Sequence, residues 1–216
     1  MDDLKILVVA GGELSPQMLY DVINNSGYGY IVGVDGGNNV LEQIHYEPDM
    51  IVGDFDSADH KVAEKYVNSP KTKLLNPMKD VTDTHYAVLE AIKLKPKAIT
   101  IVGATGKRLD HFMGNLAMLK LCLDNGVSAE ILDRYNRITM IDKQMTISKK
   151  TQYGRYVSLI PYSDVVEGIS LKGFCYELSD ATMIKADTLG ISNEIREEEG
   201  HITINNGYLM VMETKD

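Results

Sequence analysis

The chain has 216 residues, and its 44% apolar and 25% charged side chains are typical of a globular protein with one large domain or two small ones. Acidic residues outnumber basic ones by 31 to 22, and the net charge of −9 argues against nucleic acid or an anionic membrane as the main partner. No apolar run approaches the roughly 20 residues of a membrane span, and the chain starts without the basic region of a signal peptide, so we expect a cytoplasmic protein.

Up to about residue 134, short apolar runs typical of strands alternate with patterns typical of helices. In chain order, strands are predicted at residues 6–9, 31–34, 50–52, 73–75, 99–102 and 131–132. Helices are predicted to begin at Ser15-Pro16, to cover residues 83–94, and to follow His111 as far as Asn125-Gly126. This alternation predicts an α/β domain with a mostly parallel, open sheet and helices on both faces.

After about residue 135 the helical pattern stops and only strand-like runs remain. They cover residues 138–141, 156–160, 165–171, 175–178, 201–204 and 209–212. Asn206-Gly207 predicts a hairpin between the last two runs. We therefore predict a smaller all-β sandwich, with domains at residues 1–134 and 135–216. Cys122 and Cys175 lie in apolar segments, and we expect both to be reduced core residues.

The apolar run at 50–52 continues through Gly53 into two aspartates, Asp54 and Asp56. In an extended segment, residues two apart point the same way, so these carboxylates face one side. Adjacent carboxylates repel unless a cation lies between them. Mg²⁺ is a usual partner, and Mg²⁺ held by carboxylates normally accompanies a phosphate substrate. Taken alone, the motif could equally be a polar loop after a strand.

Polar clusters follow other predicted strands, and open parallel sheets bind ligands beyond the carboxyl ends of their strands. After 73–75, Thr82 or Asp83 either caps the next helix or, in the case of Asp83, adds a third carboxylate to the aspartate pair. After 99–102, Arg108 either forks onto phosphate oxygens or forms a surface ion pair worth little. Neither a dinucleotide fingerprint nor a P-loop motif occurs in the sequence.

Four motifs in a fixed order make nearly the whole chain resemble the bacterial thiamine pyrophosphokinase family. They are Asp35-Gly36-Gly37-Asn38, Pro48-Asp49-x-Ile51-x-Gly53-Asp54-Phe55-Asp56-Ser57, Lys79-Asp80-x-Thr82-Asp83, and Gly103-x-x-Gly106-x-Arg108-x-Asp110-His111 with Asn115. In the second half, Gly190-Ile191-Ser192-Asn193-Glu194 resembles the family's Ser-Asn element near the vitamin pocket. The resemblance implies an N-terminal catalytic domain that binds ATP and Mg²⁺, a C-terminal sandwich that binds thiamine, and a homodimer with active sites at the subunit interface.

The implied reaction belongs to thiamine diphosphate biosynthesis: the thiamine hydroxyl attacks the β-phosphorus of ATP, giving thiamine diphosphate and AMP. By the same resemblance, Asp54, Asp56 and Asp83 would bind Mg²⁺ and phosphate, Arg108 would stabilise the transferring diphosphate, and Asp110 would position thiamine or metal. The nucleotide site would be lined by Asp35, Gly36, Gly37, Asn38, Ser57, Lys79, Asp80, Thr82, Gly106 and Arg108. Thiamine would contact Asp110, His111, Asn115, Ser192 and Asn193.

The chain has no tryptophan, whereas some family members stack one on the pyrimidine ring of thiamine. The resemblance therefore implies another apolar wall, made by a tyrosine, Met183, Leu189 or Ile191.

Two other functions fit part of the pattern. A strand ending in Asp-x-Asp also opens the haloacid-dehalogenase-like phosphatases, in which Asp54 would be the nucleophile and Asp56 the acid and base. Against this reading, the strand after the long helix ends at Val102-Gly103-Ala104, where that family has a metal-binding acid. A non-catalytic nucleotide sensor on the same scaffold is the second alternative, because fold does not fix function.

Overall fold

The computed structural model describes residues 3–53, 64–66, 69–74 and 81–216, in two compact units that span residues 1–133 and 134–216. Five of the predicted site residues lie outside the described residues: Asp54, Asp56, Ser57, Lys79 and Asp80. Within the described part of the chain, no helix is both long and apolar enough to cross a membrane.

The first unit contains a parallel sheet in the strand order β6-β5-β1-β2-β3-β4. Its strands are β1 (Lys5–Val9), β2 (Tyr30–Val34), β3 (Met50–Gly53), β4 (Thr72–Leu74), β5 (Ala98–Val102) and β6 (Ser128–Leu132). In the three most central strands, Ile6, Ile31 and Ile99 are at most 1% exposed. This burial on both faces explains the nearly continuous apolar runs of these strands.

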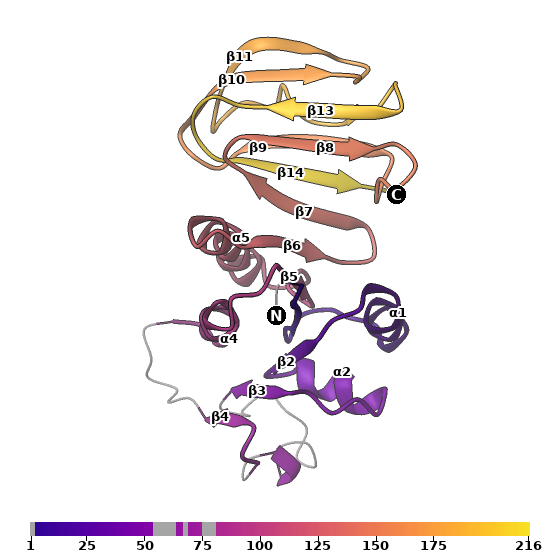
Figure 1. Cartoon of the computed structure of the whole chain (residues 1–216), viewed down its shortest axis with the longest axis vertical. Coiled ribbons are helices and arrows are strands. Elements are labelled where there is room, and N and C mark those ends of the chain that lie inside the picture. Colours follow the sequence, from indigo (N-terminus) through magenta and orange to yellow (C-terminus); the bar gives the residue numbers. More distant parts are fainter. Residues whose placement is uncertain (1–2, 54–63, 67–68, 75–80) are drawn as a thin grey trace. The chain divides into compact units, whose positions relative to one another are not determined.

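Within the described ranges, the sheet is covered by α1 (Pro16–Ser26), α2 (Gly37–Gln43), α4 (Asp83–Lys93) and α5 (Leu109–Asp124). Figure 1 shows α1 and α2 on one face and α4 and α5 on the other, which confirms the prediction of helices on both faces. The hydroxyl of Ser15 accepts a hydrogen bond from the amide of Met18 and caps α1, which ends at Gly27 with a φ of 65°. The sequence analysis missed α2, because its start, Gly37-Asn38-Asn39, is typical of a turn.

The order of the strands reverses at β1 and β5, which lie side by side in the middle of the sheet. From β1 the chain moves outward through β2 and β3, whereas from β5 it moves in the opposite direction to β6. Loops that leave two such strands diverge to opposite faces and open a crevice at the carboxyl ends of the strands. The fold therefore favours a ligand site beyond β1 and β5.

The second unit is a sandwich of two antiparallel sheets with the strand orders β12-β9-β14-β7 and β11-β10-β13-β8. The strands are β7 (Asn136–Ile141), β8 (Gln144–Ser148), β9 (Tyr156–Pro161), β10 (Val165–Lys172), β11 (Leu178–Ile184), β12 (Asn193–Glu194), β13 (Glu199–Thr203) and β14 (Leu209–Thr214). Both sheets contribute to one apolar core, for example Leu159 and Val211 from one and Ile169 and Ile202 from the other. The predicted all-β sandwich is confirmed.

The predicted hairpin at Asn206-Gly207 is wrong. Strand β13 pairs with β10 and β8, whereas β14 pairs with β7 and β9, so the turn carries the chain from one sheet to the other. The side-chain amide of Asn206 donates to the Glu167 carboxylate at 3.1 Å, and the backbones of the two residues also form an antiparallel bridge. These contacts attach the turn to β10.

The predicted strand at 175–178 is also wrong, because the strand in this region is β11, which begins at Leu178. Cys175 is exposed and is therefore not a core residue, whereas Cys122 is buried as predicted. Burial raises the pKa of the Cys122 thiol to about 12, which keeps it protonated.

Candidate active site

The carboxyl ends of β1, β2 and β5 surround a cavity of about 600 Å³ in the first unit. Its walls also include the first turns of α4 and α5. The lining residues are Ala10, Gly11, Gly12, Glu13, Asp35, Thr84, Gly103, Ala104, Thr105, Lys107, Arg108, His111 and Asn115. The cavity thus lies where the reversal of strand order predicts a ligand site, and its volume is typical of small-molecule sites.

The loops after β1 and β5 are joined through their backbones. The amide of Gly12 donates to the carbonyl of Gly103 at 2.7 Å, and the amide of Glu13 donates to the carbonyl of Thr105 at 3.1 Å. A Cβ atom on Gly12 would lie 2.4 Å from both carbonyl oxygens, so only glycine allows this approach. This part of the cavity is consequently built from closely packed main chain.

The end of β2 brings Asp35 into the wall of the cavity. Asp35 has a φ of 43°, in the left-handed region that aspartate tolerates better than most residues. Its Oδ1 lies 2.2 Å from the position that a Cβ on Gly53 would occupy. Since Gly53 directly precedes Asp54, the Asp35 carboxylate lies at the start of the aspartate segment.

The glycines of the Asp35 motif act through packing and do not line the cavity. A Cβ on Gly37 would lie 2.1 Å from the carbonyl oxygen of Val9, so glycine lets α2 begin against the end of β1. Asn38 is fully buried and donates from Nδ2 to the carbonyl oxygen of Asp35 at 3.1 Å. Gly36, Gly37 and Asn38 are not among the residues that line this cavity, and their nucleotide contacts stay a prediction.

At the start of α4, the side chain of Thr82 accepts a hydrogen bond from the amide of His85 at 3.2 Å, as an N-cap does. Thr84, in the first turn, lines the cavity, whereas Thr82 and Asp83 are not among its lining residues. Asp83 is partly exposed in the same turn. A helix N-terminus has amide groups without helical partners and favours an anion nearby.

The start of α5 provides the cationic part of the cavity. Arg108 pairs with Asp110 through contacts of 2.6 Å and 3.3 Å, and both side chains are about two-thirds exposed, at 68% and 65%. The hydrogen bond from Arg108 lowers the pKa of the Asp110 carboxyl to about 2. An ion pair this exposed stabilises a fold little, and the guanidinium can therefore exchange partners. Arg108 lines the cavity and Asp110 does not.

One turn further along α5, His111 is exposed and lines the cavity, while Asn115 is buried in its wall. The side-chain amide of Asn115 donates to the carbonyl of Ala104 at 2.8 Å. This bond holds the loop after β5 against α5. Gly106, in the same loop, has a φ of 135° and would place a Cβ 3.0 Å from the amide nitrogen of Glu13.

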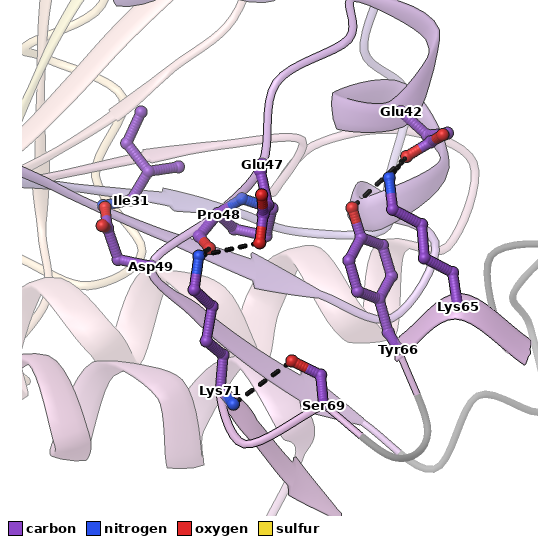
Figure 2. A network of polar contacts seen from close by, with 9 residues as sticks. All are labelled: Ile31, Glu42, Glu47, Pro48, Asp49, Lys65, Tyr66, Ser69 and Lys71. Atoms are coloured by element: carbon purple, nitrogen blue, oxygen red, sulfur yellow. Dashed lines mark hydrogen bonds and ion pairs between the residues drawn. The ribbon is translucent and has the colours of Figure 1, made fainter.

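Figure 2 shows two groups of polar contacts beyond β3 and α2. The carboxylate of Glu42, in α2, accepts from the ammonium of Lys65 at 2.6 Å and from the phenol of Tyr66 at 3.3 Å. Burial raises the pKa of this phenol, which keeps it a donor. Since Lys65 and Tyr66 follow residues 54–63, these contacts attach the chain after the aspartate segment to α2.

The second group in Figure 2 fixes the strand that follows. The ammonium of Lys71 donates to the Glu47 carboxylate at 2.9 Å and to the carbonyl of Pro48 at 3.2 Å. The Asp49 carboxylate accepts from the amide of Ile31 at 2.8 Å, which joins the start of β3 to β2. Asp49, part of the second family motif, therefore stabilises the sheet by joining β3 to β2.

In the second unit, the Asn193 side chain is used by the fold. Its Oδ1 accepts from the amides of Tyr176 and Glu194 at 3.1 and 2.9 Å, and its Nδ2 donates to the Tyr176 carbonyl at 2.7 Å. Tyr176 itself is 73% exposed. Ser192 is exposed, has a φ of 59° and donates its amide to the Ser158 hydroxyl at 3.0 Å. Asn193 thus holds the backbone of an exposed tyrosine.

Among the residues that the structure describes, no three acidic, histidine or cysteine side chains lie close enough to hold a metal ion. The predicted metal ligands Asp54 and Asp56 lie outside that set. The donor chemistry nevertheless fits Mg²⁺, because Asp35 brings a carboxylate oxygen to the residue that precedes Asp54, and carboxylates are the hard oxygen ligands that Mg²⁺ prefers.

The structure adds lining residues to which the sequence analysis assigned no role, among them Glu13, Thr84 and Lys107. A signal existed for two of them. Thr84 is the second residue of the helix predicted at 83–94, and Lys107 lies inside the fourth motif. Glu13 follows the Gly11-Gly12 pair, and a glycine pair alone is a weak signal that more often marks a tight turn.

Comparison with known proteins gives matches over most of the chain. Residues 22–131 match the family model described as "Thiamin pyrophosphokinase, catalytic domain", and residues 144–209 match "Thiamin pyrophosphokinase, vitamin B1 binding domain". Thiamine pyrophosphokinase of Bacillus subtilis is 31% identical over 186 residues, which are 86% of this chain and 87% of that protein. Its crystal structure superposes with a TM-score of 0.87, at 30% identity, over 98% of this chain and 99% of that one. The enzyme of Geobacillus thermodenitrificans gives a TM-score of 0.85, at 32% identity, over 99% and 98% of the two chains.

Proposed function

Because the chain belongs to the thiamin pyrophosphokinase family and is a diphosphotransferase that makes thiamine diphosphate, we propose that the cavity of its first unit binds ATP. The observation that carries the proposal is the place of the cavity, where the reversal of strand order brings Thr84, Lys107 and Arg108 around one space. These residues offer a helix N-terminus and two cations to a polyphosphate. Asp35 completes the wall on the side of the aspartate segment.

In the proposed reaction, the hydroxyl oxygen of thiamine attacks the β-phosphorus of ATP. The bond between the β-phosphorus and the bridging α,β-oxygen breaks, that oxygen leaves with AMP, and the hydroxyl proton goes to a base or to solvent. Phosphoryl transfer of this kind depends mainly on positioning and on neutralising charge. Arg108 is suited to this task, because its pair with Asp110 is exposed and its fork can turn to phosphate oxygens.

Mg²⁺ would be held by Asp54, Asp56 and Asp83, as the resemblance implies, and when bound it would neutralise phosphate charge. Other residues, which the structure describes, hold the main chain around this metal site. The hydrogen bond between Gly12 and Gly103 joins the loops after β1 and β5, and Asn115 holds the loop after β5 against α5. Glu42 binds Lys65 and so attaches the chain beyond the aspartate segment to α2. These are orienting roles in which no described side chain needs to move a proton.

For thiamine we propose a contact with Tyr176 in the second unit, the part of the chain that matches the vitamin B1 binding domain. Tyr176 is exposed and its backbone is held by Asn193, while Leu189 and Ile191 are also exposed, at 63% and 46%. Met183 is fully buried in the sandwich core and is unsuited to the apolar wall. The homodimer with active sites at the subunit interface is proposed from the family resemblance.

Both family models that match describe a pyrophosphokinase. This favours the transferase over a phosphatase that uses Asp54 and over a non-catalytic nucleotide sensor.

Two experiments test the proposal. ATP carrying ¹⁸O at the α,β-bridge should give labelled AMP, because attack on the β-phosphorus leaves that oxygen on AMP. Thr84→Trp should fill the cavity and abolish ATP binding in calorimetry. Gln17→Trp, at the equivalent second position of α1 but exposed to solvent, should bind ATP normally. Normal ATP binding by Thr84→Trp would contradict the assignment of the cavity.

A further inference from the structure

Asn38 lies in the first turn of α2, and its side chain packs against Gly33 of β2 with none of its surface exposed. Its backbone amide and its Nδ2 both donate to the carbonyl oxygen of Asp35, each at 3.1 Å. An amide oxygen at this distance would repel the carbonyl oxygen, so Nδ2 faces Asp35 and Oδ1 faces the other way. One asparagine therefore supplies two hydrogen bonds to the peptide group that follows the Asp35 side chain.

Asp35 is fixed from both directions. Its amide donates to the carbonyl of Val52 in β3 at 3.0 Å, and its carbonyl accepts from Asn38. Between these bonds, φ is 43°, a value that a residue with a side chain adopts at some cost and keeps only where its surroundings enforce it. The left-handed conformation of Asp35 is thus maintained by named contacts on each side.

Two glycines make room for this arrangement. A Cβ on Gly33 would lie 2.0 Å from Oδ1 of Asn38, and a Cβ on Gly53 would lie 2.2 Å from Oδ1 of Asp35. Neither contact is possible with any other residue unless the polar side chain moves. The sequence therefore provides space for the Asn38 amide and, independently, for the Asp35 carboxylate.

The amide at position 38 is costly for the fold. Within the part of the chain that the structure describes, Oδ1 of Asn38 is buried and accepts no hydrogen bond. An unpaired buried oxygen destabilises a protein, and an apolar side chain with the same branched outline, such as leucine, would avoid that loss. A residue that costs stability directly behind a residue lining the proposed ATP cavity is expected to have a role beyond packing.

We propose that Asn38 is a positioning residue that acts through Asp35: it fixes the left-handed backbone of Asp35 and so directs the carboxylate to the cavity and to the start of the aspartate segment. This inference rests on the proposed function in one respect, namely that the cavity lined by Asp35 binds ATP. It changes the expected role of Asn38 from a nucleotide contact to a support for one.

A double-mutant cycle on the full-length protein tests this inference. Asn38→Leu, Asp35→Asn and the double variant are compared for kcat and for the Kd of ATP with Mg²⁺, measured by calorimetry without thiamine. Asn38→Leu should weaken ATP binding about fivefold, the effect of one lost hydrogen bond. In the Asp35→Asn background the same substitution should add less than about twofold, because its effect passes through a carboxylate that is already absent.

The melting temperature separates positioning from folding. Asn38→Leu should melt close to the unchanged protein, since it loses both a hydrogen bond and an unpaired oxygen. Asn24→Ala is the matched control, because its Nδ2 also donates to a backbone carbonyl, that of Tyr20, at an exposed position outside the cavity. It should leave kcat and Kd unchanged. Should Asn38→Leu fail to fold, Asn38→Ala removes the same amide without adding bulk.

The inference is overturned if Asn38→Leu binds and turns over ATP normally while Asp35→Asn does not, or if the two losses simply multiply. Normal Kd and kcat in Asp35→Asn would overturn it as well, and would at the same time remove Asp35 from the proposed site. Failure of the unchanged protein to bind ATP would instead count against the proposed function itself.

Discussion

Arg108 and Asp110 form an ion pair with a closest contact of 2.6 Å at the first turn of α5, beside the cavity but open to solvent. Asp110 holds the guanidinium close to where phosphate is proposed to bind, while the exposure of the pair keeps its energetic contribution small. Asp110 is therefore suited to hold the Arg108 guanidinium until the phosphates of a substrate compete for the guanidinium.

The first prediction concerns the charge of Asp110. Its pKa is lowered to about 2 by the hydrogen bond from Arg108, below the ordinary value of 3.8. Since the folded pKa is depressed, the stability that the pair contributes is present above about pH 4 and is lost as the pH falls to about 2. Carboxyl ¹³C NMR should show Asp110 titrating near 2, and near its ordinary value in Arg108→Ala. An unchanged titration in that variant would show that Arg108 is not the cause.

The second prediction is that Arg108→Ala lowers kcat about 10²-fold, the usual effect of removing one group that stabilises developing charge, while the KM for thiamine changes much less. The reason is that the guanidinium serves the transition state more than the bound substrate. Steady-state kinetics with varied thiamine measure both constants. Arg196→Ala, an exposed arginine of the second unit, serves as the control. An effect on KM alone would contradict the assignment.

A third prediction concerns Tyr176. Tyr176→Ala should raise the KM for thiamine about fivefold, which corresponds to about 1 kcal/mol of aromatic contact, and Tyr176→Phe should restore it because the ring is retained. Asn193→Ala should act in the same direction, since its amide holds the backbone of Tyr176. Tyr20→Ala, at another exposed tyrosine, should change nothing. Thiamine kinetics that are unaffected by Tyr176→Ala would place the apolar wall elsewhere.

The fourth prediction tests the attachment of the chain to α2 shown in Figure 2. Tyr66 is 2% exposed, and its phenol donates a hydrogen bond to the Glu42 carboxylate. Tyr66→Phe removes this hydrogen bond. It should destabilise the protein by about 1 kcal/mol, which corresponds to about 2–4 °C in melting temperature for a chain of this size. Tyr20→Phe, at an exposed position, is the control. Equal melting temperatures for the two variants would show that this bond does not hold the segment.

The sequence predicted the elements of the first unit well, because buried parallel strands and amphipathic helices leave strong periodic patterns. It missed α2, whose first residues favour a turn, and it misassigned Asn206-Gly207, because a turn motif does not reveal which sheets the flanking strands join. The sequence also does not reveal which groups the side-chain amide of an asparagine contacts. Asn38 and Asn193 both stand in motifs of the family, but their side chains bond to backbone groups, which only the structure reveals.

Most of the lining of the cavity was also beyond the reach of sequence. Glu13 and Thr84 carry no motif of their own, and they meet only because the reversal of strand order places the loop after β1 beside the start of α4 and the loop after β5. The positions of Asp35 and Arg108 in the lining, by contrast, could be predicted, because the segments that follow apolar strands meet at the carboxyl edge of a parallel sheet.

The most direct test of the account is to incubate the protein with ATP, Mg²⁺ and thiamine and to identify the products by mass. The account predicts AMP and thiamine diphosphate in equal amounts, because the diphosphate is transferred as one unit. ADP with thiamine monophosphate would contradict it, since attack would then fall on the γ-phosphorus. The absence of any thiamine-dependent product would contradict the transferase activity as a whole.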